Sequence, residues 1–166
     1  MILLKILFFI NLFFLVKDDY KDREVHLWQL FTLVLLSFSF INSYEETYLA
    51  EKLIFGFVTV GILFMIRFLV ENYIVYIKSR FVEVDIKNLI VIGEGDYPLF
   101  FVIGIMFEFQ EIFLCFLLTG IFALIHHFIY KKIKADPVPL IPSIAYSIIC
   151  VLLMKYCLNF NLLINL

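Results

Sequence analysis

Long apolar segments separated by short charged ones constrain this chain more than any other feature. Hydrophobic residues make up 64% of its 166 residues, and charged residues make up 17%. Soluble domains average about 45–50% apolar and about 25% charged residues. A soluble domain of this length could not bury so much apolar surface, and an exposed surface of that kind would aggregate. The sequence therefore predicts an all-α, polytopic membrane protein in which residues 1–166 form a single transmembrane domain.

Six segments are apolar enough to be considered as membrane-spanning helices, each of which needs about 20 mainly apolar residues. The first lacks small residues at a cleavage position, so we interpret it as a retained helix rather than a signal peptide. The fourth is short, so we expect it to be tilted against protein or to stop short of one membrane face. The predicted spans are Ile2–Val16, Leu27–Ile41, Leu53–Ile77, Tyr97–Phe109, Ile112–Tyr130 and a last one from Ile141 to about Leu158.

The distribution of lysine and arginine predicts an orientation. The connections that follow the first, third and fifth segments carry nine of the 13 basic residues. Because basic residues are enriched on the cytoplasmic side, this side is predicted to face the cytoplasm and both termini to lie outside. The opposite side holds Lys5, Lys52 and Lys155, together with Glu45, Glu46, Glu51, Glu108 and Glu111.

The charge balance and the cysteines limit the choice of partners and cofactors. The net charge is -2 and no long basic run is present, which argues against a nucleic-acid partner. Cys115, Cys150 and Cys157 form no CxxC pair, and each lies in an apolar run. We therefore expect buried free thiols, no disulfide framework, no metal and no cofactor.

Two acidic motifs are predicted to meet at the cytoplasmic ends of helices. Residues 18–26 read DDYKDREVH directly after the first predicted helix, and residues 93–96 read GEGD directly before the fourth. Two carboxylates that share one proton can hydrolyse a peptide bond, because one activates water while the other polarises the carbonyl group. We expect the glycines beside Glu94 to let the backbone turn sharply and approach a substrate closely. Asp96 also suits a helix N-cap, with Pro98 just inside the helix.

Other polar residues in the apolar segments allow two interpretations each. Arg67 and Glu71 are four residues apart and share a helix face, so they could form an ion pair that lines a cavity. The alternative, which we favour, is that the third helix ends early and leaves both at the membrane interface. His126 and His127 could tune the acidic site, although histidines near a helix end more often lie at the headgroup boundary.

The spacing of the first motif resembles the first active-site signature of type IV prepilin peptidases and archaeal preflagellin peptidases. That signature reads Asp, three residues, Arg, one residue, Ile or Val, and then usually Pro. Asp19 stands four residues before Arg23, which selects it over Asp18 and Asp22, and His26 occupies the position where proline is usual. Gly93-Glu94-Gly95-Asp96 is similar to the second signature, GxGD.

This resemblance implies a function and a set of site residues. Asp19 and Asp96 would be the catalytic pair, with Arg23, Gly93 and Gly95 as motif residues. Pro142 would belong to the proline-containing entry to the last helix, although we favour the alternative that it simply marks the start of that helix. The chain lacks the two CxxC pairs that bind zinc in larger members, so it resembles the short, peptidase-only form, without assigned methyltransferase activity.

The predicted function is therefore leader-peptide removal by an aspartic endopeptidase in a bacterial or archaeal cytoplasmic membrane, with its active site facing the cytoplasm. The partners would be membrane lipid and pilin-like precursor proteins, each with a short basic leader before an apolar helix. One alternative is a non-catalytic membrane scaffold of a pilus or secretion assembly. Another is a small proton-coupled transporter that uses Asp96 and Arg67. The oligomeric state stays open.

Overall fold

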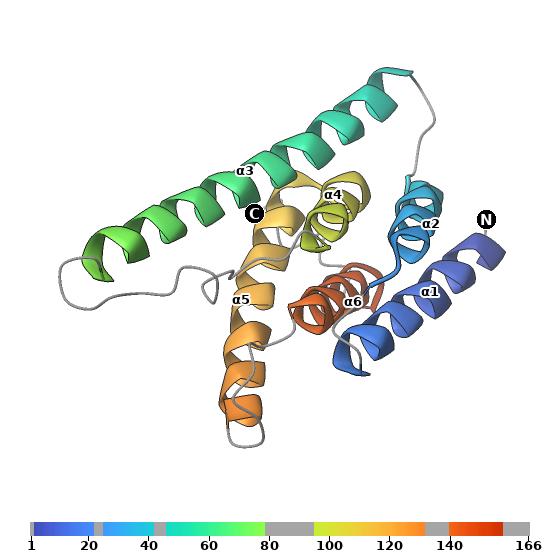
Figure 1. The fold of residues 1–166 in the computed structure, drawn as a ribbon. Coiled ribbons are helices and arrows are strands. Elements are labelled where there is room, and N and C mark those ends of the chain that lie inside the picture. The colour runs from blue at the N-terminus through green and yellow to red at the C-terminus, as the bar shows by residue number, and fades with distance from the viewer. Residues whose placement is uncertain (1, 22–24, 42–45, 79–94, 132–139, 158–166) are drawn as a thin grey trace.

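Six α-helices and one short 3-10 helix make up the described part of the chain. The structure is a computed structural model, and it describes residues 2–21, 25–41, 46–78, 95–131 and 140–157 (Figure 1). The prediction of an all-α fold is therefore confirmed. The elements are α1 (Ile2–Lys21), α2 (Leu27–Ser37), η1 (Phe38–Phe40), α3 (Glu46–Lys78), α4 (Asp96–Met106), α5 (Phe109–Lys131) and α6 (Ile141–Cys157).

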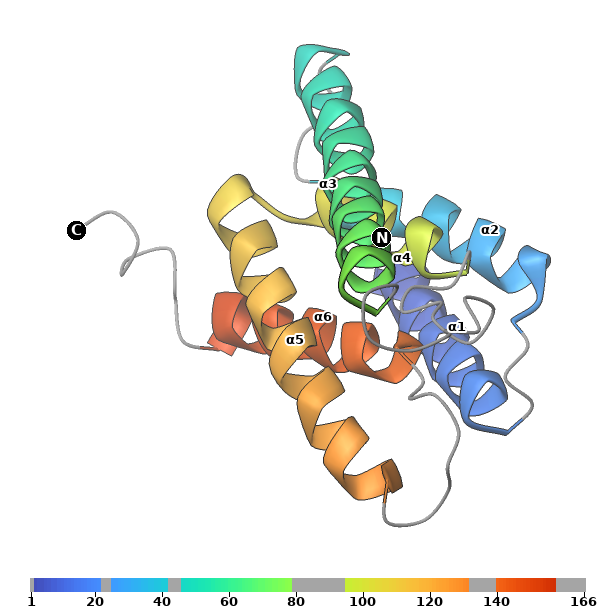
Figure 2. The same ribbon diagram turned by 60° about the vertical axis from the view of Figure 1, so that its left-hand side comes forward.

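The helices α4 and α6 lie at the centre of the molecule. α4 packs against α2, α3 and α6, while α6 packs against α1 and α5. As a result α1 and α2 flank one side of the α4–α6 pair, and α3 and α5 flank the other (Figures 1 and 2). Eight of the 11 residues of α4 are buried, which makes it the most enclosed helix.

Small residues allow α3 and α4 to approach closely. A Cβ atom on Gly104 would stand only 2.5 Å from the Cα of Gly56, so the contact requires a glycine at position 104. Thr59 of α3 donates a hydrogen bond from Oγ1 to the carbonyl oxygen of Phe100 at 2.8 Å. Close backbone packing with a hydroxyl bond across the interface is the arrangement that stabilises helix pairs in lipid.

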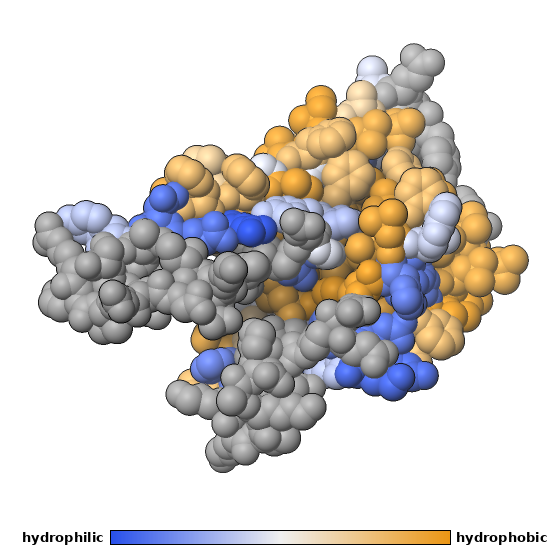
Figure 3. All heavy atoms as spheres, viewed as in Figure 1, coloured by the Kyte–Doolittle hydropathy of each residue, from blue (hydrophilic) through white to orange (hydrophobic). Residues whose placement is uncertain are grey.

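The outer surface is largely apolar. Figure 3 shows apolar side chains over the visible faces of α1 and α2, with hydrophilic ones gathered around the C-terminal end of α1. Two stretches, Thr47–Tyr73 and Phe109–Ile129, are long and apolar enough to cross a membrane, and in each an apolar window of 18 residues is only 17% buried within the molecule. A core helix of a soluble protein would be mostly buried, so these helices fit a protein whose apolar side chains face lipid.

Four of the charged residues that were predicted to lie on the outer side contact one another around the turn between α4 and α5. Lys52 is 2% exposed and donates to Glu108 at 2.7 Å and to the carbonyl oxygen of Phe107 at 2.9 Å. Lys155 of α6 pairs with Glu111 at 3.0 Å, and Glu111 also accepts the backbone N–H of Glu108 at 2.9 Å. These bonds fix the turn between α4 and α5 against both α3 and α6.

Two helices are longer than their apolar segments predicted. α1 continues past Val16 to Lys21, so Asp18 and Asp19 lie inside the helix and not in a loop after it. α3 begins at Glu46 rather than Leu53 and continues to Lys78. The end of an apolar segment underestimates the length of such a helix, because charged side chains in its last turns can extend toward water.

Candidate active site

Asp19 lies in the last turn of α1, and it is 8% exposed. The neighbouring Asp18 is half-buried and accepts a hydrogen bond from Gln29 Nε2 of α2 at 2.6 Å. Successive side chains on a helix point about 100° apart. The two adjacent carboxylates therefore have different surroundings, and Asp19 is the one enclosed by the bundle.

Asp96 is the first residue of α4, and it is 5% exposed. The alternative that Asp96 is the N-cap is wrong by one residue, because Gly95 occupies the N-cap position and Asp96 lies in the first turn. A carboxylate in the first turn is stabilised by the positive end of the helix dipole. Pro98 follows as the third helical residue, where its missing N–H leaves no intrahelical bond unmade.

The two aspartates border the same apolar core. Leu15, one turn before Asp19, and Leu99, three residues after Asp96, are both fully buried members of one hydrophobic cluster. The cluster is built from α1, α2, α4, α5 and α6 as well as Leu63 of α3. The two buried aspartates therefore lie close in sequence to members of this core, Asp19 at the C-terminal end of a helix and Asp96 at an N-terminal end.

Gly95 has an ordinary backbone conformation. Its φ of -68° and ψ of -16° are helical angles that any residue can adopt, so the sharp turn expected here is not present at this position. Among the described residues, nothing lies within 4 Å of the place a Cβ would take. No described residue therefore covers the backbone of Gly95 beside Asp96. Gly93, Glu94 and Arg23 lie outside the described residues.

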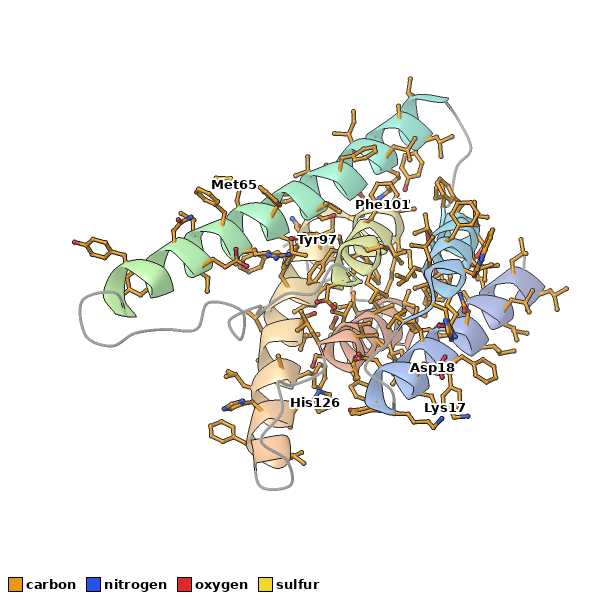
Figure 4. All side chains as sticks on the ribbon, viewed as in Figure 1. Lys17, Asp18, Met65, Tyr97, Phe101 and His126 are labelled. Atoms are coloured by element: carbon orange, nitrogen blue, oxygen red, sulfur yellow. The ribbon has the colours of Figure 1, made fainter. Side chains whose placement is uncertain are left out.

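A chain of hydrogen bonds connects the residue after Asp19 to two other helices. The Tyr20 hydroxyl lies 3.0 Å from Nε2 of His126 on α5, and Nδ1 of His126 lies 2.8 Å from Oγ of Ser143 on α6. His126 projects from α5 toward α1 and α6 (Figure 4). His126 therefore bonds toward the interior of the bundle, whereas His127 is exposed, and the headgroup position expected for both stays a prediction.

A second polar group connects the residue after Asp96 to α3. Arg67 donates from Nη1 to the Tyr97 hydroxyl at 3.2 Å and from Nε to Glu71 at 2.8 Å. Because α3 continues for eleven residues beyond Arg67, the favoured interpretation of an early helix end is wrong. These three side chains, with Phe64 and Phe68, line an open pocket of about 500 Å³, and Tyr97 points toward α3 in Figure 4.

The remaining predicted residues take ordinary structural positions. Pro142 is the buried second residue of α6, which suits a proline in the first turn of a helix. Cys115 is a buried free thiol and Cys150 a half-buried one. Within the described residues, no group of three or more His, Cys, Asp or Glu side chains is arranged to hold a metal ion.

Comparison with protein families identifies the chain. The model of the type IV leader peptidase family (peptidase A24) matches residues 6–128, which is most of the sequence. The chain belongs to the type IV leader peptidase family. The matched range contains Asp19 and the GEGD motif that ends at Asp96. Comparison with curated proteins gives no match, and neither does comparison with solved structures. Membership in the type IV leader peptidase family implies aspartic peptidase chemistry and prepilin-type substrates at the level of the family.

Sequence reasoning missed the contacts of Tyr20, Tyr97 and His126. A signal for the first two was present, since each predicted catalytic aspartate is followed directly by a tyrosine. Nothing in the sequence indicates the partners, because Tyr20 and His126 are 106 residues apart.

Proposed function

We propose that this chain is an intramembrane aspartyl endopeptidase that removes the basic leader peptide from type IV pilin-like precursors at the cytoplasmic membrane border. The observation that carries the proposal is the family match over residues 6–128, because that range contains two aspartates that are both buried at helix ends. Buried carboxylates are costly unless they are paired or functional. Asp19 and Asp96 are the proposed catalytic pair.

The proposed reaction needs only these two carboxylates and water. The ionised carboxylate takes a proton from a water molecule, and the resulting hydroxide attacks the scissile carbonyl carbon. The protonated carboxyl donates a hydrogen bond to the carbonyl oxygen, and the tetrahedral intermediate then collapses. The C–N bond breaks as the leaving nitrogen accepts a proton from the pair.

The helix ends favour one division of roles. The N-terminal end of α4 favours negative charge at Asp96, whereas the C-terminal end of α1 disfavours it at Asp19. We therefore propose that Asp96 activates water in the resting enzyme and that Asp19 polarises the carbonyl group. The proton belongs to the pair as a unit and returns to its starting position after each cycle.

The proposed topology brings water to the pair. We propose that all six helices cross or enter the membrane, with both termini outside and the two aspartates toward the cytoplasm. The 11 residues of α4 are about 16 Å long, whereas the hydrocarbon core is about 30 Å thick. A helix of this length ends inside the membrane. The bilayer beside Asp96 must therefore be thinner, or a water-filled cavity must lie there.

The backbone of Gly95, which no described residue covers, supports the proposed way of binding substrate. A helical substrate hides its scissile carbonyl group in its own hydrogen bonds, so it must unwind where it is cut. An extended segment can approach a bare backbone more closely than one that carries side chains. We propose that the unwound segment of the precursor lies against Gly95, beside Asp96.

The test is cleavage of a co-expressed precursor that carries a short basic leader before an apolar helix. Wild type is compared with Asp19→Asn and Asp96→Asn, each checked for membrane insertion. Asp18→Asn is the matched control, because Asp18 is the adjacent acidic side chain and its amide could still bond to Gln29. We expect wild type and Asp18→Asn to shorten the precursor and the other two variants to leave it intact.

Cleavage by Asp19→Asn or Asp96→Asn at the wild-type rate would contradict the catalytic pair. If both variants cleave normally, the non-catalytic scaffold becomes the better interpretation. Loss of cleavage in Asp18→Asn with retention in Asp19→Asn would instead move the first catalytic role to the neighbouring residue.

A further inference from the structure

Each proposed catalytic aspartate is followed directly by a tyrosine, and both tyrosines are held in the same manner. Asp19 precedes Tyr20, and Asp96 precedes Tyr97. Each tyrosine hydroxyl bonds to a basic side chain of a different helix, namely His126 of α5 and Arg67 of α3. The same local arrangement thus occurs twice, at sites 77 positions apart in the chain.

The contact at Tyr20 fixes the end of α1 to two helices. Its hydroxyl lies 3.0 Å from His126, and the two rings meet edge to face at 6.0 Å between centroids. A neutral imidazole has one donor and one acceptor nitrogen, and here both are used, since Ser143 lies 2.8 Å from the second. The His126 ring is therefore held at both nitrogens and cannot turn without breaking a bond.

The contact at Tyr97 fixes the start of α4 to α3. Arg67 is oriented by its bond to Glu71, one turn further along α3, and from there it reaches the Tyr97 hydroxyl. In Figure 4 the Tyr97 side chain extends from α4 toward α3, away from α1. The planar guanidinium group gives such bonds a defined direction.

Helix ends are the least rigid parts of helices, and both proposed catalytic residues lie at such ends. Adjacent side chains share a backbone and point about 100° apart, so fixing one limits how the other can rotate about the helix axis. Catalytic groups must be held to within about 0.5 Å, and a misplacement of about 1 Å can lower a rate about a hundredfold.

We propose that Tyr20 with His126, and Tyr97 with Arg67, are positioning residues that set the orientation of Asp19 and Asp96 for hydrolysis. This inference rests on the proposed function. Neither tyrosine reacts with the substrate. Each acts through the aspartate that precedes it, and its partner acts through the tyrosine.

The first test removes one oxygen at a time. Purified Tyr20→Phe and Tyr97→Phe are assayed on a precursor peptide in detergent micelles, with kcat and KM measured separately. We expect kcat to fall about ten- to a hundredfold with KM nearly unchanged, since the aspartates are misaligned while the substrate surface is intact. Tyr146→Phe and Tyr73→Phe are the matched controls. Tyr146 lies against His126 at 5.7 Å between ring centroids, and Tyr73 is exposed on α3.

The second test asks whether each pair acts as a unit. His126→Leu should lower kcat as much as Tyr20→Phe does, and the double variant should be no worse than either single one. His126→Gln should restore part of kcat relative to His126→Leu, because the amide can still bond to the Tyr20 hydroxyl. A purely structural role would lower the unfolding temperature without this pattern in kcat.

The outcomes separate this inference from the proposed function. If Asp19→Asn and Asp96→Asn are inactive while both phenylalanine variants keep the wild-type kcat, the positioning role is wrong and the catalytic pair stands. Additive losses in the Tyr20→Phe, His126→Leu double variant would also overturn it. If Asp19→Asn and Asp96→Asn cleave normally, the proposed function itself has failed.

Discussion

The contact between Gly104 and Gly56 yields the sharpest stability prediction. α3 is the longest helix, and it packs mainly against α4. In Gly104→Ala the new methyl group would stand 2.5 Å from the Gly56 Cα, 2.6 Å from its nitrogen and 2.6 Å from the Phe55 carbonyl oxygen. All three are backbone atoms that no side-chain rotation can move. The two helices must therefore separate.

The size of the effect follows from that geometry. Ordinary contact begins near 3.4 Å, so α3 and α4 must part by about 1 Å. Overpacking of this kind costs about 1–3 kcal/mol. The same movement stretches the bond from Thr59 to Phe100, and bonds between helices in a membrane contribute about 0.6–2 kcal/mol. We expect Gly104→Ala to lower the free energy of unfolding by about 2–4 kcal/mol.

Three other glycines provide a graded comparison. In Gly56→Ala the methyl group meets the ring of Phe101 at 2.7 Å, and this side chain can move, so the loss should be smaller. At Gly61 and Gly120 nothing among the described residues lies within 4 Å of a new Cβ. Alanine favours a helix over glycine by about 1 kcal/mol, so Gly61→Ala and Gly120→Ala should be neutral or stabilising.

The assay is reversible unfolding in mixed micelles, followed by circular dichroism for wild type and the four variants. The predicted order of stability places Gly61→Ala and Gly120→Ala at or above wild type, then Gly56→Ala, then Gly104→Ala. If Gly104→Ala were as stable as Gly61→Ala, the close approach of the two backbones would be refuted.

Two further predictions concern the ends of α4. Gly95→Ala should unfold like wild type, because its methyl group meets no described residue and its backbone angles suit alanine. It should nevertheless raise KM for the precursor several-fold in the cleavage assay. An unchanged KM would contradict substrate contact at this backbone. At the other end, burial alone would raise the pKa of Glu108, but the hydrogen bond and charge of Lys52 outweigh burial and lower that pKa. A lowered folded-state pKa means that this contribution to stability is complete above the ordinary glutamate pKa of 4.5 and is lost as the pH falls through the lowered value. In wild type the unfolding temperature should therefore fall as the pH drops below about 4.5, and Glu108→Gln should make this fall less steep. The change should be small because Glu108 is half-exposed. The same fall in wild type and Glu108→Gln would show that the pair contributes nothing to stability.

The sequence predicted the number and order of the helices, because six apolar runs separated by charged connections leave little choice for a chain in lipid. It failed at the ends of α1 and α3. Lys17 to Lys21 are polar, yet they continue α1, since Asp18 bonds to α2 and Lys21 suits the last turn. The end of an apolar segment does not reveal polar turns that continue the helix, because these turns are stabilised by contacts with a neighbouring helix.

The sequence also allowed only part of the candidate site to be predicted, because the rest depends on contacts between helices. Asp19 and Asp96 were predicted as the catalytic pair from motif spacing, which is a local property of the sequence. The partners of the adjacent tyrosines were not found, because they depend on how α5 and α3 are placed. His126 and Arg67 each looked like an interfacial residue near a helix end, and only the packed bundle distinguishes a side chain that bonds inward from one that reaches the lipid headgroups.

The depth of Asp96 is set by α3 at both ends of α4. Lys52 binds the carbonyl oxygen of Phe107 just beyond the end of α4, and Arg67 binds Tyr97 near its start. The 15 residues from Lys52 to Arg67 cover about 22 Å, whereas the ten from Tyr97 to Phe107 cover about 15 Å. The difference of about 7 Å is within the reach of long lysine and arginine side chains that bend toward each other. α4 is therefore held at a fixed height between two cations, and its short length leaves the Asp96 end well inside the span of α3. In the proposed topology Asp96 would therefore lie below the membrane surface, and the thinned or water-filled region proposed beside it would let water reach it.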